Sequence, residues 1–284
     1  AQLLARRRLY RVHHPRNSLL HLPSTSGSHL RRGLSWQGIV IDTVFTNTAL
    51  PVGESLAAGV LASDNLQHWF QADGAHVDLT GDTIDNWIDR KGSGRVLAPV
   101  AGSATLDDAA LGAFPAALFD DASSDHYALS GSTLPWSGAF TIAAVARLDD
   151  LASGLRMLVG AGSGSTFYLG RIDTQTMRLR CGGTNNINAV FPNTTDWFSV
   201  IASYDGTSVG KVSINGAAAI SGAASDPSVS SATVLGATAS SGTGFWSGHI
   251  SDLMIWNIDL LASGAAAERA RVEAFFASAY GIGA

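Results

Sequence analysis

The sequence predicts an all-β protein: an antiparallel β-sandwich with one C-terminal α-helix, preceded by an extended basic arm. Three observations lead to this prediction. From about residue 67 onward, short apolar runs alternate with clusters of Gly, Ser, Asn and Asp, which is typical of sandwich domains. Near the C-terminus the apolar residues change to a helical period, and at the N-terminus every charged side chain up to residue 41 is basic.

The composition fits a protein with a substantial buried core. Of the 284 residues, 46% are apolar and 14% are charged, which argues against a disordered chain or a coiled coil. No apolar stretch approaches the roughly 18 residues that a membrane-spanning helix needs, so we expect no membrane span. The single cysteine, Cys181, excludes an intrachain disulfide and a Cys-rich zinc site.

Residues 1–38 are predicted to form an extended anchoring arm. Residues 1–41 include seven arginines and no acid, whereas the rest of the chain has 11 basic and 23 acidic residues. The arginines are Arg6, Arg7, Arg8, Arg11, Arg16, Arg31 and Arg32. Such a segment cannot bury enough of itself to become ordered alone, so we expect it to lie on a partner. Interleaved leucines favour other structural proteins over nucleic acid as this partner, and an organelle transit peptide is a further alternative.

Residues 39–66 are expected to connect the arm to the sandwich. Residues 39–46 are rich in β-branched side chains and favour a strand, and Pro51 interrupts the chain before the apolar segment 56–62. We therefore predict a connector whose strand could pair with a neighbouring chain, followed by one sandwich domain over residues 67–284.

Two consecutive β-hairpins give the clearest strand signal. Residues 198–204 and 210–214 are separated by Asp205-Gly206, and Asn215-Gly216 follows the second run. Asp-Gly and Asn-Gly supply the positive φ angles that tight hairpin turns require. Further strands are expected at 140–147, 156–161, 165–171, 176–180, 233–235 and 249–256, the last two as a pair.

A helix is predicted over residues 265–280. Val272, Phe275, Phe276 and Ala279 recur at the spacing of one helical face, so this face is expected to pack on the sandwich. Gly281 follows at the position where a glycine commonly ends a helix.

Several short motifs together carry a resemblance to a known family. They are Trp69-Phe-Gln-Ala-Asp73, Asn86-Trp-Ile-Asp-Arg-Lys-Gly-Ser-Gly-Arg95, Phe114-Pro-Ala-Ala-Leu-Phe-Asp-Asp121, and the closing strand and helix over 248–281. From residue 67 to about 282 the chain resembles laminin-G-like jelly rolls of the concanavalin A-like lectin/glucanase superfamily, of the kind found in bacteriophage structural proteins. The resemblance implies a jelly-roll fold. It leaves function open, because this superfamily includes glycan-binding modules, β-glucanases and non-catalytic structural domains.

We expect no enzymatic activity. The resemblance to the glucanase branch would imply paired glutamates at a Glu-x-Asp-x-x-Glu spacing, and retaining glycosidases need two carboxyl groups about 5 Å apart. The chain has three glutamates, Glu54, Glu268 and Glu273, and none has this spacing. No Gly-x-Ser-x-Gly, phosphate-loop or His-Glu-x-x-His motif is found.

Glycan binding normally uses an exposed aromatic ring that stacks on a sugar, with polar side chains around it. The candidates in loops and strand connections are Trp136, Asn185, Asn186, Phe245 and Trp246. The alternative for the two tryptophans is packing at the rim of the sandwich. The tryptophans in strand-like contexts are expected in the core: Trp69, Trp87, Trp197 and Trp256.

A calcium site is the one cofactor that the sequence suggests. Asp120, Asp121 and Asp125 form a carboxylate cluster in a loop, and Asp85 and Asp89 lie on either side of a tryptophan. Calcium prefers hard oxygen ligands of this kind. Solvated turn residues are the alternative reading, because aspartate is common in turns.

Together these features predict a structural or adhesive component of a virion, a capsid decoration or a tail-associated protein. The arm would anchor the chain within an oligomeric assembly, and the jelly roll would be displayed on the virion surface, where it could bind cell-surface glycans. The alternatives are a free, secreted carbohydrate-binding protein and, less favoured, a glycoside hydrolase.

Overall fold

A computed structural model of the protein describes residues 52–111, 114–129, 138–152, 154–161, 166–192, 194–227, 233–238 and 243–283. Three sequence predictions lie outside these residues: the arm with its arginines, the strand at 39–46 and the candidate Trp136.

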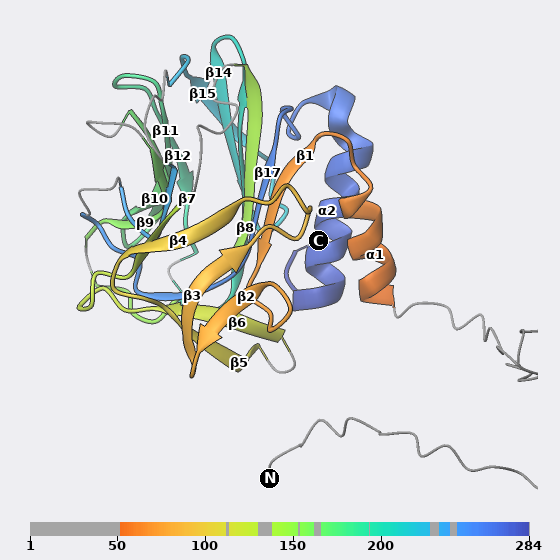
Figure 1. The fold of residues 1–284 in the computed structure, drawn as a ribbon. Coiled ribbons are helices and arrows are strands. Elements are labelled where there is room, and N and C mark those ends of the chain that lie inside the picture. The colour runs from red at the N-terminus through yellow and green to blue at the C-terminus, as the bar shows by residue number, and fades with distance from the viewer. Residues whose placement is uncertain are drawn as a thin grey trace, which may run out of the picture. The chain divides into compact units, whose positions relative to one another are not determined.

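The described chain folds into strands with helices near its two ends (Figure 1). The helices are α1 (Val52–Leu61), the short 3₁₀ helix η1 (Ser263–Ala265) and α2 (Ala266–Tyr280). The first strands are β1 (Leu66–Gln71), β2 (Val77–Thr80), β3 (Thr83–Ile88), β4 (Val96–Ala101), β5 (Thr105–Leu111), β6 (Phe114–Phe119), β7 (His126–Leu129), β8 (Ala139–Leu148) and β9 (Arg156–Ala161). They are followed by β10 (Phe167–Asp173), β11 (Thr176–Cys181), β12 (Asn186–Val190), β13 (Phe198–Asp205), β14 (Val209–Ile214), β15 (Ile220–Ala223), β16 (Thr233–Leu235) and β17 (Gly248–Trp256).

Antiparallel pairings arrange these strands in two layers. The first layer, called here the helix-side sheet, has the order β15-β14-β13-β8-β17-β1. The opposite sheet has the order β12-β11-β10-β9-β16-β7-β4-β3-β2. Strands β5 and β6 join the layers at one side, because β6 pairs with β17 and β5 contacts β3. The predicted all-β, antiparallel jelly-roll sandwich with a C-terminal helix is confirmed.

Strand β8 shows how one sequence pattern builds two cores. Successive strand residues point to opposite faces of a sheet. Phe140, Ile142 and Ala144 therefore face the interior between the sheets, whereas Ala143 and Val145 face outward and pack beneath the helices. Since both faces are covered, the strand reads as a continuous apolar run rather than as an alternation.

Helix α2 covers the outer face of the helix-side sheet, with α1 beside it (Figure 1). Its buried side chains are Val272, Phe275, Phe276, Ala279 and Tyr280. Gly281 ends the helix in the left-handed conformation with φ 66°, which a residue without a side chain adopts easily. The predicted helix, its buried face and its end are confirmed.

Helix α1 corrects the prediction of a connector over residues 39–66. Ala57 and Val60 are buried in the same apolar cluster as the inner face of α2. Lys91 Nζ donates hydrogen bonds of 2.7 Å to the carbonyl oxygens of Leu61 and Ser63, which fixes the end of the helix. The folded unit therefore begins before the boundary predicted at residue 67.

The two predicted hairpins are confirmed, and one predicted strand pair is wrong. Strand β13 pairs with β14 and β14 pairs with β15, with the turns at Asp205-Gly206 and Asn215-Gly216. The segments predicted as a last pair, β16 and β17, lie in different sheets. Strand β16 pairs with β7 and β9, whereas β17 pairs with β1, β6 and β8.

Candidate functional site

The predicted glycan-binding residues do not form one site. Asn185 and Asn186 lie at the turn between β11 and β12, whereas Phe245 and Trp246 directly precede β17. The pairing register places the β11–β12 turn beside the end of β9. The loop before β17 lies beside the beginning of β9. The two pairs of residues are therefore at opposite ends of the opposite sheet.

Trp246 corrects the prediction of an exposed stacking ring. Its side chain is fully buried and packs in the interior against Phe198, with ring centroids 6.3 Å apart. A sugar cannot stack on a ring that has no accessible face. Phe245 is partly exposed and packs against the His126 ring at 5.5 Å, and the Nδ2 group of Asn185 donates to Ser225 Oγ at 3.3 Å. Asn186 is exposed at the start of β12.

The three aspartates of the calcium candidate make hydrogen bonds and an ion pair within the protein. Among the residues that the structure describes, no three His, Cys, Asp or Glu side chains lie close enough to hold a metal ion. Asp121 instead pairs with Arg156 Nη2 at 3.0 Å, and Asp125 Oδ2 accepts a hydrogen bond from the Asp120 backbone N–H at 2.9 Å. The Asp120 carboxylate accepts from the Ala122 backbone and the Ser123 hydroxyl, so these aspartates stabilise their own loop.

The second aspartate pair likewise serves local structure. Asp89 is buried and accepts hydrogen bonds from the backbone N–H groups of Trp69 and Lys91, each at 2.9 Å, and from the His68 ring and the Ser93 hydroxyl. Burial alone would raise the pKa of Asp89, but these hydrogen bonds outweigh it and lower the pKa below its usual value.

This Ser, His and Asp group is not arranged for nucleophilic catalysis. A catalytic histidine lies between serine and carboxylate and takes the serine proton. Here the Ser93 hydroxyl donates directly to Asp89, and the same ring nitrogen of His68 faces both groups. The arrangement therefore orders the turn after β3.

Three of the four tryptophans expected in the core are fully buried, and the fourth marks a surface site. Trp69, Trp87 and Trp256 have no exposed surface, whereas Trp197 is only partly buried. Trp197 directly precedes β13 on the outer face of the helix-side sheet. The Arg147 guanidinium lies 5.5 Å from its ring centroid, and the His249 ring meets it edge-on at 6.0 Å.

His249 joins two carboxylates beside this ring. Its Nδ1 is 3.1 Å from Asp149 Oδ1, and its Nε2 is 3.3 Å from Asp107 Oδ2. Arg147 Nη2 lies 2.9 Å from the same Nδ1 and 3.2 Å from Asp149 Oδ1. Trp197, Arg147, His249, Asp107 and Asp149 are called here the Trp197 patch.

The Trp197 patch combines a buried centre with accessible polar groups. The His249 side chain is 4% exposed, whereas Asp107, Asp149 and Arg147 are 42%, 38% and 29% exposed. A neutral imidazole that accepts from Arg147 at Nδ1 donates from Nε2 to Asp107. In this arrangement His249 positions Asp107 and Arg147 positions Asp149, and the remaining oxygen lone pairs of both carboxylates can accept hydrogen bonds from a ligand.

Strand geometry explains why these residues meet. Arg147 of β8 continues the outward-facing series of Ala143 and Val145, and β17 pairs with β8 so that His249 lies opposite Arg147. Asp107 comes from β5, which pairs with β6 beside the start of β17. The patch is therefore assembled from four strands or strand ends that are far apart in sequence.

A family comparison agrees with this architecture. The family model described as the concanavalin A-like lectin/glucanases superfamily matches residues 121–264, half of the chain. The chain belongs to this superfamily.

Solved structures show the same fold in larger proteins. The binding domain of botulinum neurotoxin DC in complex with SialylT has a TM-score of 0.52 and 13% identity, covering 75% of this chain and 52% of that one. The binding domain of Paraclostridial Mosquitocidal Protein 1 has a TM-score of 0.52 and 12% identity, covering 73% and 52%. A structure of botulinum neurotoxin type C, whose cell entry is described as dependent on interaction with two ganglioside molecules, has a TM-score of 0.52 and 13% identity, covering 76% of this chain and 53% of that one.

These likenesses concern the fold alone. The chain spans about half the length of the solved structures it matches. A search of curated proteins found no matching sequence.

The superfamily includes glucanases, but the glutamates whose side chains are described have other roles. Glu268 accepts hydrogen bonds from the Ser63 hydroxyl and from Asn65 Nδ2, which holds α2 to the segment after α1. Glu273 lies 3.4 Å from Arg269 on the same helix. Neither belongs to a strand of the sandwich, where the glucanase branch places its carboxyl pair.

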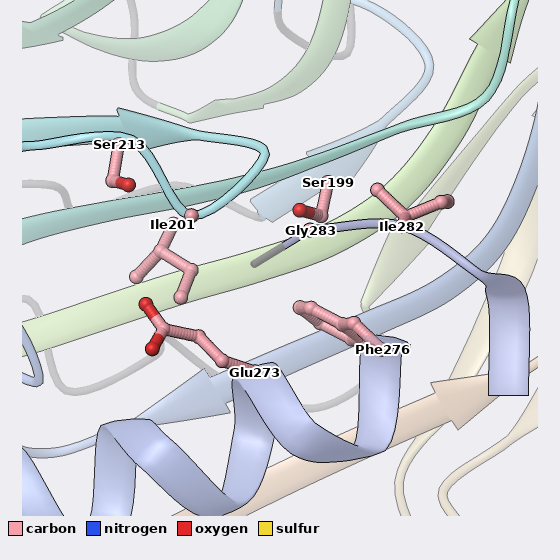
Figure 2. A pocket seen from close by; sticks show the side chains of 8 residues that line it. Ser199, Ile201, Ser213, Glu273, Phe276, Ile282 and Gly283 are labelled. Carbon is pink, nitrogen blue, oxygen red and sulfur yellow. The ribbon is translucent and has the colours of Figure 1, made fainter. Parts of the chain in front are cut away.

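Two cavities differ from the Trp197 patch in their chemistry. A pocket of about 60 Å³ lies between α2 and the helix-side sheet (Figure 2) and is far smaller than usual ligand pockets. Its labelled lining residues are Ser199, Ile201, Ser213, Glu273, Phe276, Ile282 and Gly283. A groove of about 320 Å³ lies between β12 and β14–β15, with Val190 82% exposed at its rim, and its lining is nearly all apolar. The pocket has polar side chains beside the Phe276 ring but is too small for a sugar, and the groove offers few polar groups.

No helix in the described part of the chain is both long and apolar enough to cross a membrane.

Proposed function

We propose that the folded unit is a non-enzymatic glycan-binding module and that the Trp197 patch holds the sugar. The observation that carries this proposal is a partly exposed tryptophan ring beside two accessible carboxylates and an arginine. An apolar ring contacts the C–H face of a pyranose, while its hydroxyl groups need charged or polar partners.

The chemistry of the patch suits a ligand rich in hydroxyl groups. Asp107 and Asp149 are acceptors, and Arg147 is a donor, so the patch offers both kinds of partner to vicinal hydroxyls. His249 and Arg147 hold the carboxylates of Asp107 and Asp149 before a ligand arrives, which reduces the ordering cost of binding. The solved structures of similar fold support this proposal by analogy, since cell entry of one of these toxins is described as dependent on interaction with two ganglioside molecules.

A glycan array followed by calorimetry tests the proposal. The probes are neutral, amino and sialylated oligosaccharides, and the variants are Trp197→Ala and the control Phe114→Ala, which removes an exposed aromatic ring on β6. We expect the wild-type chain and the control to bind the same glycan and Trp197→Ala to bind it at least about tenfold more weakly. Equal glycan affinity of Trp197→Ala and the wild type, or no binding to any probe, would overturn the proposal.

We further propose that the module is displayed on a virion surface as part of an oligomeric assembly, anchored to other structural proteins by residues 1–38. The basic, acid-free composition of the arm supports this proposal, because such a segment can bind an acidic surface on a neighbouring protein.

Deletion of residues 1–38 tests the anchoring role. We expect the shortened chain to fold and bind glycan as before but to be lost from purified particles. Unchanged incorporation would contradict the anchor and favour the alternative, a free secreted carbohydrate-binding protein.

A further inference from the structure

Arg171 is a fully buried cation whose hydrogen-bonding groups are mostly unused. It lies near the end of β10, and its Nη2 donates to the carbonyl oxygen of Ala152. Its Nε and Nη1 groups are buried and meet no acceptor within the described residues. A guanidinium has five N–H donors in a planar arrangement, so most of them are left without a protein partner.

Arg156 brings a second positive charge to the same place. The β9–β10 register makes Arg156 and Arg171 Cα partners. The Arg156 side chain is 15% exposed and pairs through Nη2 with Asp121 at 3.0 Å and more distantly with Asp150 at 3.7 Å. Its Nε is buried and has no acceptor in the described part of the chain.

The two arginines are not equally compensated. Asp121 and Asp150 lie against Arg156, whereas no described carboxylate forms an ion pair with Arg171. Burial lowers the pKa of Arg171 and the charge of Arg156 lowers it further, while Asp150 and Asp173 oppose this from a distance. An arginine side chain nevertheless stays protonated in proteins, so a charge persists here. A buried charge without a partner of opposite charge strongly destabilises the folded state.

We propose that Arg171, with the Nε of Arg156, binds a small inorganic anion at this end of the sandwich. An anion supplies acceptors for the unused N–H groups and also offsets the second positive charge, whereas a water molecule would supply only acceptors. The complete burial of Arg171 restricts the ligand to a small ion. An ion from solvent has only a short path to Arg171, because Asp173, two residues further along β10, is exposed.

This site is independent of the proposed glycan binding. Within the described residues, no side chain of the Trp197 patch forms a hydrogen bond with Arg171 or Arg156. An anion here would stabilise the loop after β8 through Ala152, and glycan binding could fail without affecting it.

The experiment uses the full chain and chloride as the probe. Thermal unfolding is followed in increasing sodium chloride, with sodium gluconate replacing it to hold the ionic strength constant. A ligand that binds only the folded state raises the melting temperature with concentration, here by about 2–6 °C if binding saturates. We expect this rise for the wild type and for the control Arg178→Met, which removes a surface arginine of β11, but not for Arg171→Met.

A second measurement does not depend on a variant that folds. A crystal grown or soaked in sodium bromide should show anomalous density within hydrogen-bonding distance of the Arg171 guanidinium. Bromide at this position supports the proposal. A water molecule there, or equal melting temperatures in chloride and gluconate, overturns it.

Discussion

The outer face of the helix-side sheet has two halves with opposite chemistry, although the same two strands, β8 and β17, run through both. In the half beneath α2, Asp252 of β17 is fully buried and accepts hydrogen bonds from Trp69 Nε1 at 2.5 Å and from the Tyr280 hydroxyl. In the other half, three residues earlier on β17, His249 lies between two partly exposed carboxylates.

The comparison shows that the role of a carboxylate on this face depends on whether helix α2 covers it, rather than on the strand that carries it or its neighbours. Burial raises the pKa of Asp252 to about 6, although the hydrogen bonds from Tyr280 and Trp69 lower it in part. Its direct donors are neutral groups, whereas the carboxylates of the Trp197 patch face charged or ionisable ones. The covered half therefore serves stability, and the open half is free to bind.

The largest effect is expected from removing the cover. Phe275 of α2 is buried and meets Trp69 edge-on, with ring centroids 5.1 Å apart. Phe275→Ala should lower the free energy of unfolding by about 3–5 kcal/mol, because it removes a large buried ring and leaves a cavity. Chemical denaturation measures this change. Val190→Ala, at an exposed position, is the control and should change the free energy by less than about 0.5 kcal/mol. Similar losses in both variants would show that α2 does not hold the fold together.

The second prediction concerns the pH dependence of the covered half. The pKa of Asp252 rises from 3.8 to about 6 on folding, so the folded state holds this proton more tightly. The contribution of Asp252 to stability is fully present below about pH 4 and is lost as the pH rises to about 6. Between pH 4 and 7 we expect the wild type to lose about 2–3 kcal/mol of unfolding free energy relative to Asp252→Asn.

Asp205 provides a control of opposite sign. Burial would raise the pKa of Asp205, but hydrogen bonds from the backbone N–H groups of Val209, Thr207 and Ser208 outweigh it and lower the pKa to about 2. Stability from Asp205 is therefore present above about pH 4 and is lost as the pH falls toward 2. Parallel pH profiles for the wild type and Asp252→Asn would contradict the assignment of the shift to Asp252.

The smallest effect on stability is expected in the open half. Asp149→Asn should change the free energy of unfolding by less than about 1 kcal/mol, because partly exposed ion pairs contribute little. The same substitution should weaken glycan binding measurably by calorimetry, whereas the exposed Asp78→Asn should leave binding unchanged. A large loss of stability in Asp149→Asn would remove the distinction between the two halves.

The sequence predicted features that depend on neighbours along the chain. Asp205-Gly206 and Asn215-Gly216 specify hairpins locally, and the spacing of Phe275 and Phe276 reveals a helical face. Helix α1 could not be predicted from the sequence pattern, because a proline such as Pro51 usually indicates a break in regular structure. Proline is also common where a helix begins, and the partner of this helix lies some 200 residues away.

The candidate site required contacts that no local pattern encodes. His249 meets Asp107 across 142 positions in the sequence and Asp149 across 100. Burial of single rings was equally hard to predict: Trp197, expected in the core, is partly exposed, whereas Trp246, a candidate for stacking on a sugar, is buried. One available signal was that Arg147 ends an apolar strand, where a charged residue must reach solvent or a partner.

The pairing of β1 with β17 has a consequence for how the chain is made. Leu66 of β1 has Trp256 as its partner, so β1 stays unpaired until β17, some 190 residues later, has left the ribosome. At usual rates of synthesis this interval lasts on the order of ten seconds or more. The helix-side sheet is therefore completed only after translation of β17, and folding of this layer should be slow because its closing contacts span most of the sequence.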